Sequence, residues 1–264
     1  MEAKLPHPAS PGVPWGLVFR ICLISLLISR VGELLCAVFG LGGLWSTAVL
    51  SLLSTLLPAA AWHRQVPVSS FVFTGKPALK TPFLIAGGLG GLLLINALLS
   101  LPFSSGSAGT EGETSAQALV VFALIPAVGE ELLYRGMLWK LMELGSRRAL
   151  LIGSSLCFAM GHRGIGAVVF ALIAGLLLGL IRLHSGSLAA CMVTHGLHNA
   201  LSLLLTGEAP GLWFWVLTGG GGVLFVLLLP RGASPASPGS FQPTREDLLV
   251  FGLFAAAALL FGLI

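Results

Sequence analysis

Two adjacent glutamates and one arginine stand out in a chain that carries little charge. The stretch VGEELLYRG, residues 128–136, contains Glu130, Glu131 and Arg135, although only 9% of the 264 residues are charged. Glu131 and Arg135 are four residues apart, with the acid nearer the N-terminus, which is the favourable order for a helical ion pair. Glu130 points to another side of the same helix. We therefore predict that Glu131 and Arg135 form a buried supporting pair, and that Glu130 faces a cavity.

Histidines on two other apolar segments could work with Glu130. FAMGH ends at His162, and HGLHN contains His195, His198 and Asn199, of which His195 and Asn199 are four apart and share a helix face. A single histidine in an apolar helix is more often a packing residue, and we interpret His198 in this way. His162, His195 and Asn199, together with Glu130, lie on three separate apolar segments. Because ionisable groups within a membrane are costly, we predict that these four residues form one functional site.

The three patterns together resemble a known family. EELLYR fits E-E-x-x-x-R, FAMGH fits F-x-x-x-H and HGLHN fits H-x-x-x-N, in that order along the chain. Each pattern alone recurs by chance, but the ordered set resembles the CPBP intramembrane proteases. That family includes CAAX prenyl endopeptidases, bacteriocin-processing proteins and abortive-infection proteins, and the chain is also similar to its myxosortase-like members. The resemblance covers about residues 115–206.

The resemblance implies a role for each residue of the predicted site. Glu130 would be the general base that activates a water molecule, and His162 would position that water. His195 and Asn199 would form the oxyanion site. General physical chemistry is consistent with these roles, because a low-dielectric cavity makes a carboxylate a better proton acceptor and fixed donors stabilise a developing oxyanion.

A metal is the alternative to this mechanism. Members of the family are often described as metalloproteases, and Glu130, His162 and His195 would be the ligands of a zinc ion. The chain lacks the H-E-x-x-H motif of helical zinc proteases, and Asn199 is a poor zinc ligand. We predict a glutamate mechanism without a metal or other cofactor, and zinc remains the alternative.

The composition places these residues in a membrane. Hydrophobic residues make up 56% of the chain and charged residues only 9%, whereas soluble domains carry about 25% charged residues. The net charge of +4 is small and dispersed, which argues against nucleic acid as a partner. The four cysteines lie in apolar stretches without C-x-x-C spacing, so we expect reduced, buried thiols.

The apolar segments predict an all-α, polytopic transmembrane helix bundle with an intramembrane catalytic cavity. A spanning helix needs about 20 apolar residues. The candidate spans are 14–40, 43–62, 82–101, 116–145, 147–161, 164–183, 186–206, 211–229 and 247–264. The fifth is short and the fourth contains Pro126, so these two could be kinked or re-entrant. We predict eight spans, with nine as the alternative, in one transmembrane domain (14–264) that follows a polar leader (1–13) and has its catalytic core at about 115–206.

Basic residues predict the orientation. The polar loop 102–117 contains no lysine or arginine, whereas three other loops are basic: Arg64, Lys76 and Lys80; Lys140, Arg147 and Arg148; Arg231 and Arg245. With nine spans, these three loops share one side, which the positive-inside rule makes cytoplasmic together with the N-terminus. The site would then be biased towards the outer leaflet. The excess of arginine over lysine, with abundant glycine and alanine, favours a bacterial plasma membrane.

Several functions stay open from the sequence alone. As a protease, the protein would act on a membrane-anchored protein or peptide with a C-terminal sorting tail, a leader peptide or a prenylated C-terminus. A transporter or proton pathway would also use buried Glu and His residues. A third alternative is a non-catalytic immunity or scaffold protein that keeps the same fold.

Overall fold

The computed structural model describes residues 12–72, 78–100, 116–205, 211–229 and 252–253. All regular structure in these ranges is helical, which confirms the all-α prediction. The predicted leader, the polar loops 102–117 and 230–247 and the last apolar segment 247–264 lie wholly or largely outside the described residues.

The helices follow the apolar segments closely. The long helix of residues 116–142 is continuous, but two of its turns, η1 and η2, are π-helical. The elements are α1 (Trp15–Val38), α2 (Leu44–Ala61), α3 (Ser69–Val72), α4 (Thr81–Ser100), α5 (Ala116–Leu119), η1 (Val120–Leu124), α6 (Ile125–Glu131), η2 (Leu132–Leu138), α7 (Trp139–Met142), α8 (Arg147–Ala159), α9 (Ile165–Ser185), α10 (Leu188–Leu204) and α11 (Leu212–Leu228).

Helix lengths separate full spans from shorter elements. Within the described residues, five helices are long and apolar enough to cross a membrane: α1, α2, α4, the continuous helix 116–142, and α9. The apolar helices α10 and α11 have 17 residues each. Helix α8 has only 13 residues. It rises about 20 Å, against a hydrocarbon core of about 30 Å. The expectation that this segment is short is therefore confirmed.

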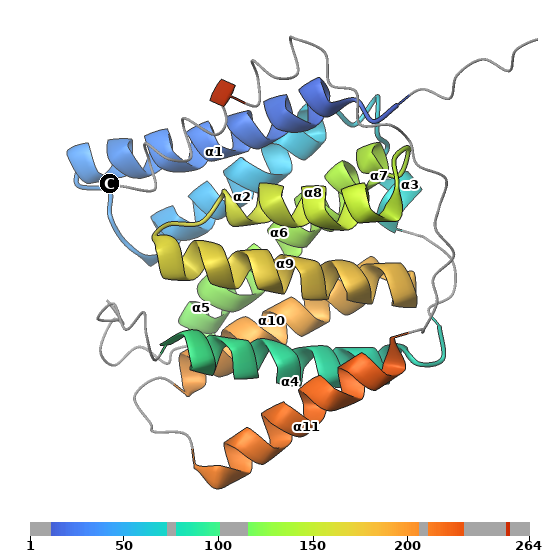
Figure 1. Ribbon diagram of the computed structural model, residues 1–264. Coiled ribbons are helices and arrows are strands. Elements are labelled where there is room, and N and C mark those ends of the chain that lie inside the picture. Colours follow the sequence, from blue (N-terminus) through green and yellow to red (C-terminus); the bar gives the residue numbers. More distant parts are fainter. Residues whose placement is uncertain (1–11, 73–77, 101–115, 206–210, 230–251, 254–264) are drawn as a thin grey trace, which may run out of the picture.

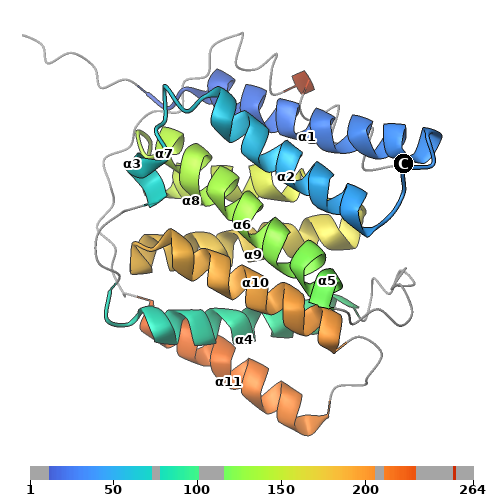
Figure 2. The ribbon, with the colours of Figure 1, turned by 180° about the vertical axis from the view of Figure 1, so that it is seen from behind.

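The helices lie in two layers. Figure 1 shows α1, α8, α9 and α4 one below another in the front layer. Figure 2, from behind, shows α2, α6 and α10 in the other layer, with α11 beside α4 at the lower edge. Helix α6 contacts both α2 and α10, so Glu130 and Glu131 at its end lie in the middle of the bundle.

Glycines allow two of these contacts to be very close. A Cβ atom on Gly175 of α9 would lie 2.9 Å from Ser155 Cβ of α8, and one on Gly179 would lie 2.9 Å from Leu151 Cδ2. At the lower edge, a Cβ on Gly90 of α4 would lie 2.9 Å from Gly221 Cα of α11. Close backbone approach is a common way of packing helices in membranes, where lipid removes most of the hydrophobic driving force.

The cysteines match their prediction in part. None of the four forms a disulfide, and Cys22, Cys157 and Cys191 are buried. Cys36 differs because it is only half-buried and lines a cavity between α1 and α2. The prediction of four buried thiols is wrong at this position, because the end of α1 projects beyond the packed part of the bundle.

Candidate active site

The Glu131 carboxylate holds two partners at once. Its Oε1 atom accepts hydrogen bonds from Arg135 Nη1 and His195 Nδ1, each at 2.9 Å. Glu131 and Arg135 are fully buried, as the sequence predicts. Arg135 also donates to Gly175 O at 3.2 Å, and its guanidinium carbon lies 4.4 Å from the centroid of the Phe158 ring. The Glu131–Arg135 pair therefore connects the E-E-x-x-x-R motif to α8, α9 and α10.

The hydrogen bond between His195 and Glu131 determines which nitrogen of the imidazole ring faces Glu130. The Glu131 carboxylate, paired with Arg135, is an acceptor, so Nδ1 of His195 carries a proton. Nε2 then faces Glu130, with 3.9 Å between Nε2 and Glu130 Oε2. This distance is too long for a direct hydrogen bond and is one that a water molecule can bridge. A neutral ring offers a lone pair at Nε2, whereas a charged ring offers an N–H donor.

Glu130 lies where cavities meet. In the described part of the chain it lines three: a polar cavity of about 290 Å³ and a mixed one of about 400 Å³ towards α1 and α2, and a more apolar one of about 460 Å³ towards α9 and α10. Its side chain is 23% exposed, in contrast to the fully buried Glu131. The preceding Gly129 has no side chain to separate the helices, and Thr55 of α2 occupies the space that a Cβ would take. The different environments predicted for the two acids are therefore observed.

His162 lies in the turn between α8 and α9. Its Nδ1 donates to Phe158 O at 3.0 Å, because a carbonyl can only accept, so Nε2 is the nitrogen available to other groups. The Phe158 ring lies edge-on to both imidazoles, with centroid distances of 4.7 Å to His162 and 5.9 Å to His195. One aromatic side chain thus fixes both histidines of the predicted site.

The Asn199 amide is oriented by a chain of hydrogen bonds. Asn96 Nδ2 of α4 donates to Ser202 Oγ at 3.3 Å, and Ser202 Oγ lies 3.3 Å from His198 Nε2. His198 Nδ1 lies 3.2 Å from Asn199 Oδ1, and the His198 ring stacks on Phe170. With each group donating to the next, the Asn199 oxygen is occupied and its NH₂ group remains as the donor that this residue can offer.

The predicted site residues share one cavity. Glu130, His162, His195 and Asn199 all line the cavity of about 460 Å³, although they come from α6, the α8–α9 turn and α10. Sequence reasoning missed the link from His198 to Asn199. The available signal was weak, because a histidine beside the H-x-x-x-N pair also fits ordinary packing.

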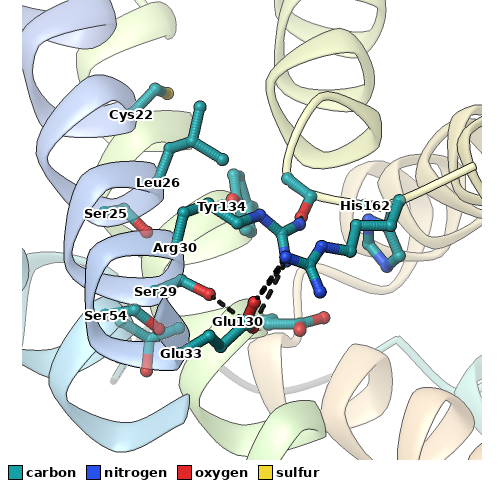
Figure 3. Close-up of a pocket in the computed structure, with 13 residues that line it drawn as sticks. Cys22, Ser25, Leu26, Ser29, Arg30, Glu33, Ser54, Glu130, Tyr134 and His162 are labelled. Atoms are coloured by element: carbon teal, nitrogen blue, oxygen red, sulfur yellow. Dashed lines mark hydrogen bonds and ion pairs between the residues drawn. The ribbon is translucent and has the colours of Figure 1, made fainter. Parts of the chain in front are cut away.

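Sequence reasoning also missed a charged cluster on the other side of Glu130. Figure 3 shows Arg30 and Glu33 reaching from α1 into the polar cavity that His162 and Glu130 also line. Arg163, beside His162, completes the cluster. The signal was present in the sequence, because Arg30 and Glu33 are charged residues inside the first apolar segment.

Comparison with known proteins agrees with this geometry. Residues 112–201 match a family model described as type II CAAX prenyl endopeptidase Rce1-like. The match covers less than half of the chain, and over these residues it supports the CPBP family of intramembrane proteases. No curated protein and no solved structure matches the chain.

This match supports a peptide hydrolase and favours that function over a transporter. The matched residues include every position of the three motifs. Together with the apolar helices, the match identifies a multi-pass membrane protein.

The residues that would hold a metal are Glu130, His162 and His195, which line the same cavity. Among the described residues, no three His, Cys, Asp or Glu side chains lie together as a metal-binding group. Glu130 Oε2 and His195 Nε2 lie 3.9 Å apart, and Glu131 holds Nδ1 of the same ring, as carboxylates also do beside metal-bound histidines. Structural and catalytic zinc sites need at least three protein ligands. Metal independence stays a prediction, which chelation can test.

Proposed function

We propose that this protein is an endopeptidase that hydrolyses a peptide bond near the terminus of a membrane-associated protein, with water activated by Glu130. The observation that carries this proposal is the meeting of Glu130, His162, His195 and Asn199 at one cavity inside the bundle. Each residue there offers a function that peptide hydrolysis needs: a base, a group that orients water, and donors for an oxyanion.

The first step is attack by water on the peptide carbonyl. Glu130 takes one proton from the water, and His162 Nε2 orients it, while the new C–O bond forms. The carbonyl oxygen becomes an oxyanion, to which the Asn199 NH₂ group donates. The C–N bond then breaks, and the proton held by Glu130 passes to the leaving nitrogen.

His195 contributes to the oxyanion site in its charged form. The Nδ1 proton is committed to Glu131, so a donor at Nε2 requires the ring to carry both protons. Glu131 already pairs with Arg135, so the second carboxylate near that charge is Glu130, 3.9 Å from Nε2. Glu131 therefore supports the oxyanion site through His195, in addition to its pairing with Arg135.

The apolar cavity supports a substrate with an apolar part. Its wall includes Leu92, Phe122, Phe170 and Leu178, on the side of Glu130 away from the charged cluster. Three substrate classes fit this description: a prenylated C-terminus, a membrane sorting tail and a leader peptide. The family description names CAAX prenyl endopeptidases, so a prenylated C-terminus is the first class to test.

A comparison of protein termini tests the function without a known substrate. A deletion strain is complemented with the wild-type gene or with Glu130→Gln, and intact proteins are compared by mass spectrometry. We expect uncleaved termini of at least one membrane-associated protein only in the Glu130→Gln strain. Identical termini in both strains, with both proteins present in the membrane, would refute the proposal.

A further inference from the structure

Two side chains of α1 contact the turn that carries His162, one at the residue before His162 and one at the residue after it. Arg30 Nη2 donates to the carbonyl oxygen of Gly161, the residue before His162, at 2.6 Å. Glu33 Oε2 lies 3.0 Å from Nη2 of Arg163, the residue after His162. Arg30 and Glu33 are themselves paired, with Arg30 Nη1 at 3.2 Å from both carboxylate oxygens. Figure 3 shows this pair reaching from α1 towards the turn.

The two contacts differ in burial, which makes the hydrogen bond from Arg30 stronger than the ion pair between Glu33 and Arg163. Arg30 is 7% exposed, whereas Glu33 and Arg163 are 36% and 48% exposed. A charge-assisted hydrogen bond from a buried guanidinium is about twice as strong as a neutral one. The Arg30–Gly161 contact is therefore the main anchor, and the Glu33–Arg163 pair adds a second.

The hydrogen bonds within the turn are all local. Gly161 and Gly164 flank the site residue, and Gly164 has φ of 74°, in the region that glycine adopts most readily. Apart from ring packing, His162 is fixed by its Nδ1 bond to Phe158 O and by its backbone N–H bond to Ala159 O, both of which are local. Contacts from another helix are thus needed to fix the turn relative to Glu130.

We propose that Arg30 and Glu33 are positioning residues of the protease, which hold the Gly161–Arg163 turn so that His162 stays aligned with Glu130. This inference rests on the proposed hydrolytic function for its activity readout. Helix α1 lies outside the matched residues 112–201, so this part of the machinery comes from a region that the family motifs do not include.

The proposal predicts a kinetic signature. A displacement of about 1 Å in a catalytic group can reduce the rate by about 100-fold. Glu33→Gln, which keeps the side-chain shape but removes the charge, is expected to lower kcat by about 10-fold with little change in KM, since the substrate-side cavity is untouched. Arg30→Gln is expected to lower kcat further, and Arg30→Lys to restore part of the loss because it retains a charged donor.

The chain offers a matched control. Glu143 of the exposed Lys140–Glu143 pair has the same i,i+3 spacing, at 2.7 Å, and lies away from the cavities of the site. Glu143→Gln removes the same charge and is expected to leave kcat unchanged. If Glu33→Gln and Glu143→Gln have the same kcat, the positioning role is refuted.

A second readout does not depend on activity. In full-length protein in detergent, hydrogen exchange is followed in peptides that cover residues 158–165. We expect faster exchange there in Glu33→Gln and Arg30→Lys, with unchanged protection in α10 and an unchanged Tm. Loss of protection throughout the bundle would mean a general structural role and would overturn the proposal. Should wild-type protein cleave no substrate while the exchange result holds, the proposed hydrolytic function fails and the turn anchoring stands.

Discussion

His195 Nδ1 lies 2.9 Å from Glu131 Oε1, so the second acid of the Glu-Glu pair holds a histidine from α10 as well as the arginine one turn away. Two adjacent residues therefore do different work. Glu130 is available to the cavities, whereas Glu131 fixes the geometry around it.

The division between the two acids predicts different mutant phenotypes. Glu130→Gln is expected to abolish turnover with Tm unchanged, because Glu130 faces the cavities. Glu131→Gln is expected to lose activity and about 3–5 kcal/mol of stability, because it leaves the buried Arg135 charge uncompensated. Thermal unfolding in detergent and a cleavage assay measure both. Equal Tm and equal activity for the two variants would contradict this division.

Asn199 is expected to act in the transition state. Asn199→Ala removes one oxyanion donor, which reduces kcat by about 10²–10³-fold. KM should change little, because the donor acts weakly on the bound substrate. Steady-state kinetics separate the two parameters. A loss confined to KM would make Asn199 a residue for substrate recognition instead.

His198 is expected to act through Asn199. His198→Phe retains a ring that can stack on Phe170 but removes the hydrogen bond to Asn199 Oδ1. The predicted loss in kcat is about 10-fold, smaller than that for Asn199→Ala, because the amide keeps its place but loses its orientation. In the double variant His198→Phe/Asn199→Ala the two losses should not add. Additive losses would show that His198 acts independently.

Chelation tests the metal-free mechanism. Purified enzyme dialysed against EDTA and then against metal-free buffer is expected to retain its activity, because the proposed base is Glu130 itself. Activity is measured before and after dialysis, and again after zinc is added back. Loss on dialysis with recovery on adding zinc would reverse this prediction.

Sidedness can be measured with single cysteines. Arg148, at the start of α8, and Ile165, at the start of α9, are both exposed and lie at opposite ends of the α8–α9 hairpin. With a cytoplasmic N-terminus, Ile165→Cys should react with a membrane-impermeant thiol reagent in intact cells, and Arg148→Cys only after permeabilisation. A Cys36→Ala background removes the half-buried native thiol. The opposite labelling pattern would place the His162 turn at the cytoplasmic face.

Much of this arrangement could be predicted from local sequence. Apolar segments of the right length gave helix bounds within a few residues, because a membrane helix must satisfy its backbone internally over a set distance. The pairing of Glu131 with Arg135 follows from helical spacing alone. The contact from Arg30 to Gly161 could not be predicted in this way, because 131 residues separate the partners. The same applies to the contact between Glu131 and His195, which spacing within one helix cannot reveal.

The short helix α8 also affects how well the protein matches the thickness of the bilayer. Its outward residues Ile152 and Leu156 are exposed, so this 13-residue helix presents an apolar face that is shorter than the hydrocarbon core is thick. Such a mismatch is relieved when the bilayer thins locally or when the end of the helix lies below the membrane surface. Where the bilayer thins, His162 lies close to the aqueous phase, and a scissile bond near the end of an embedded segment has only a short distance to travel. The activity of the enzyme should therefore vary with the chain length of the lipids in which it is reconstituted.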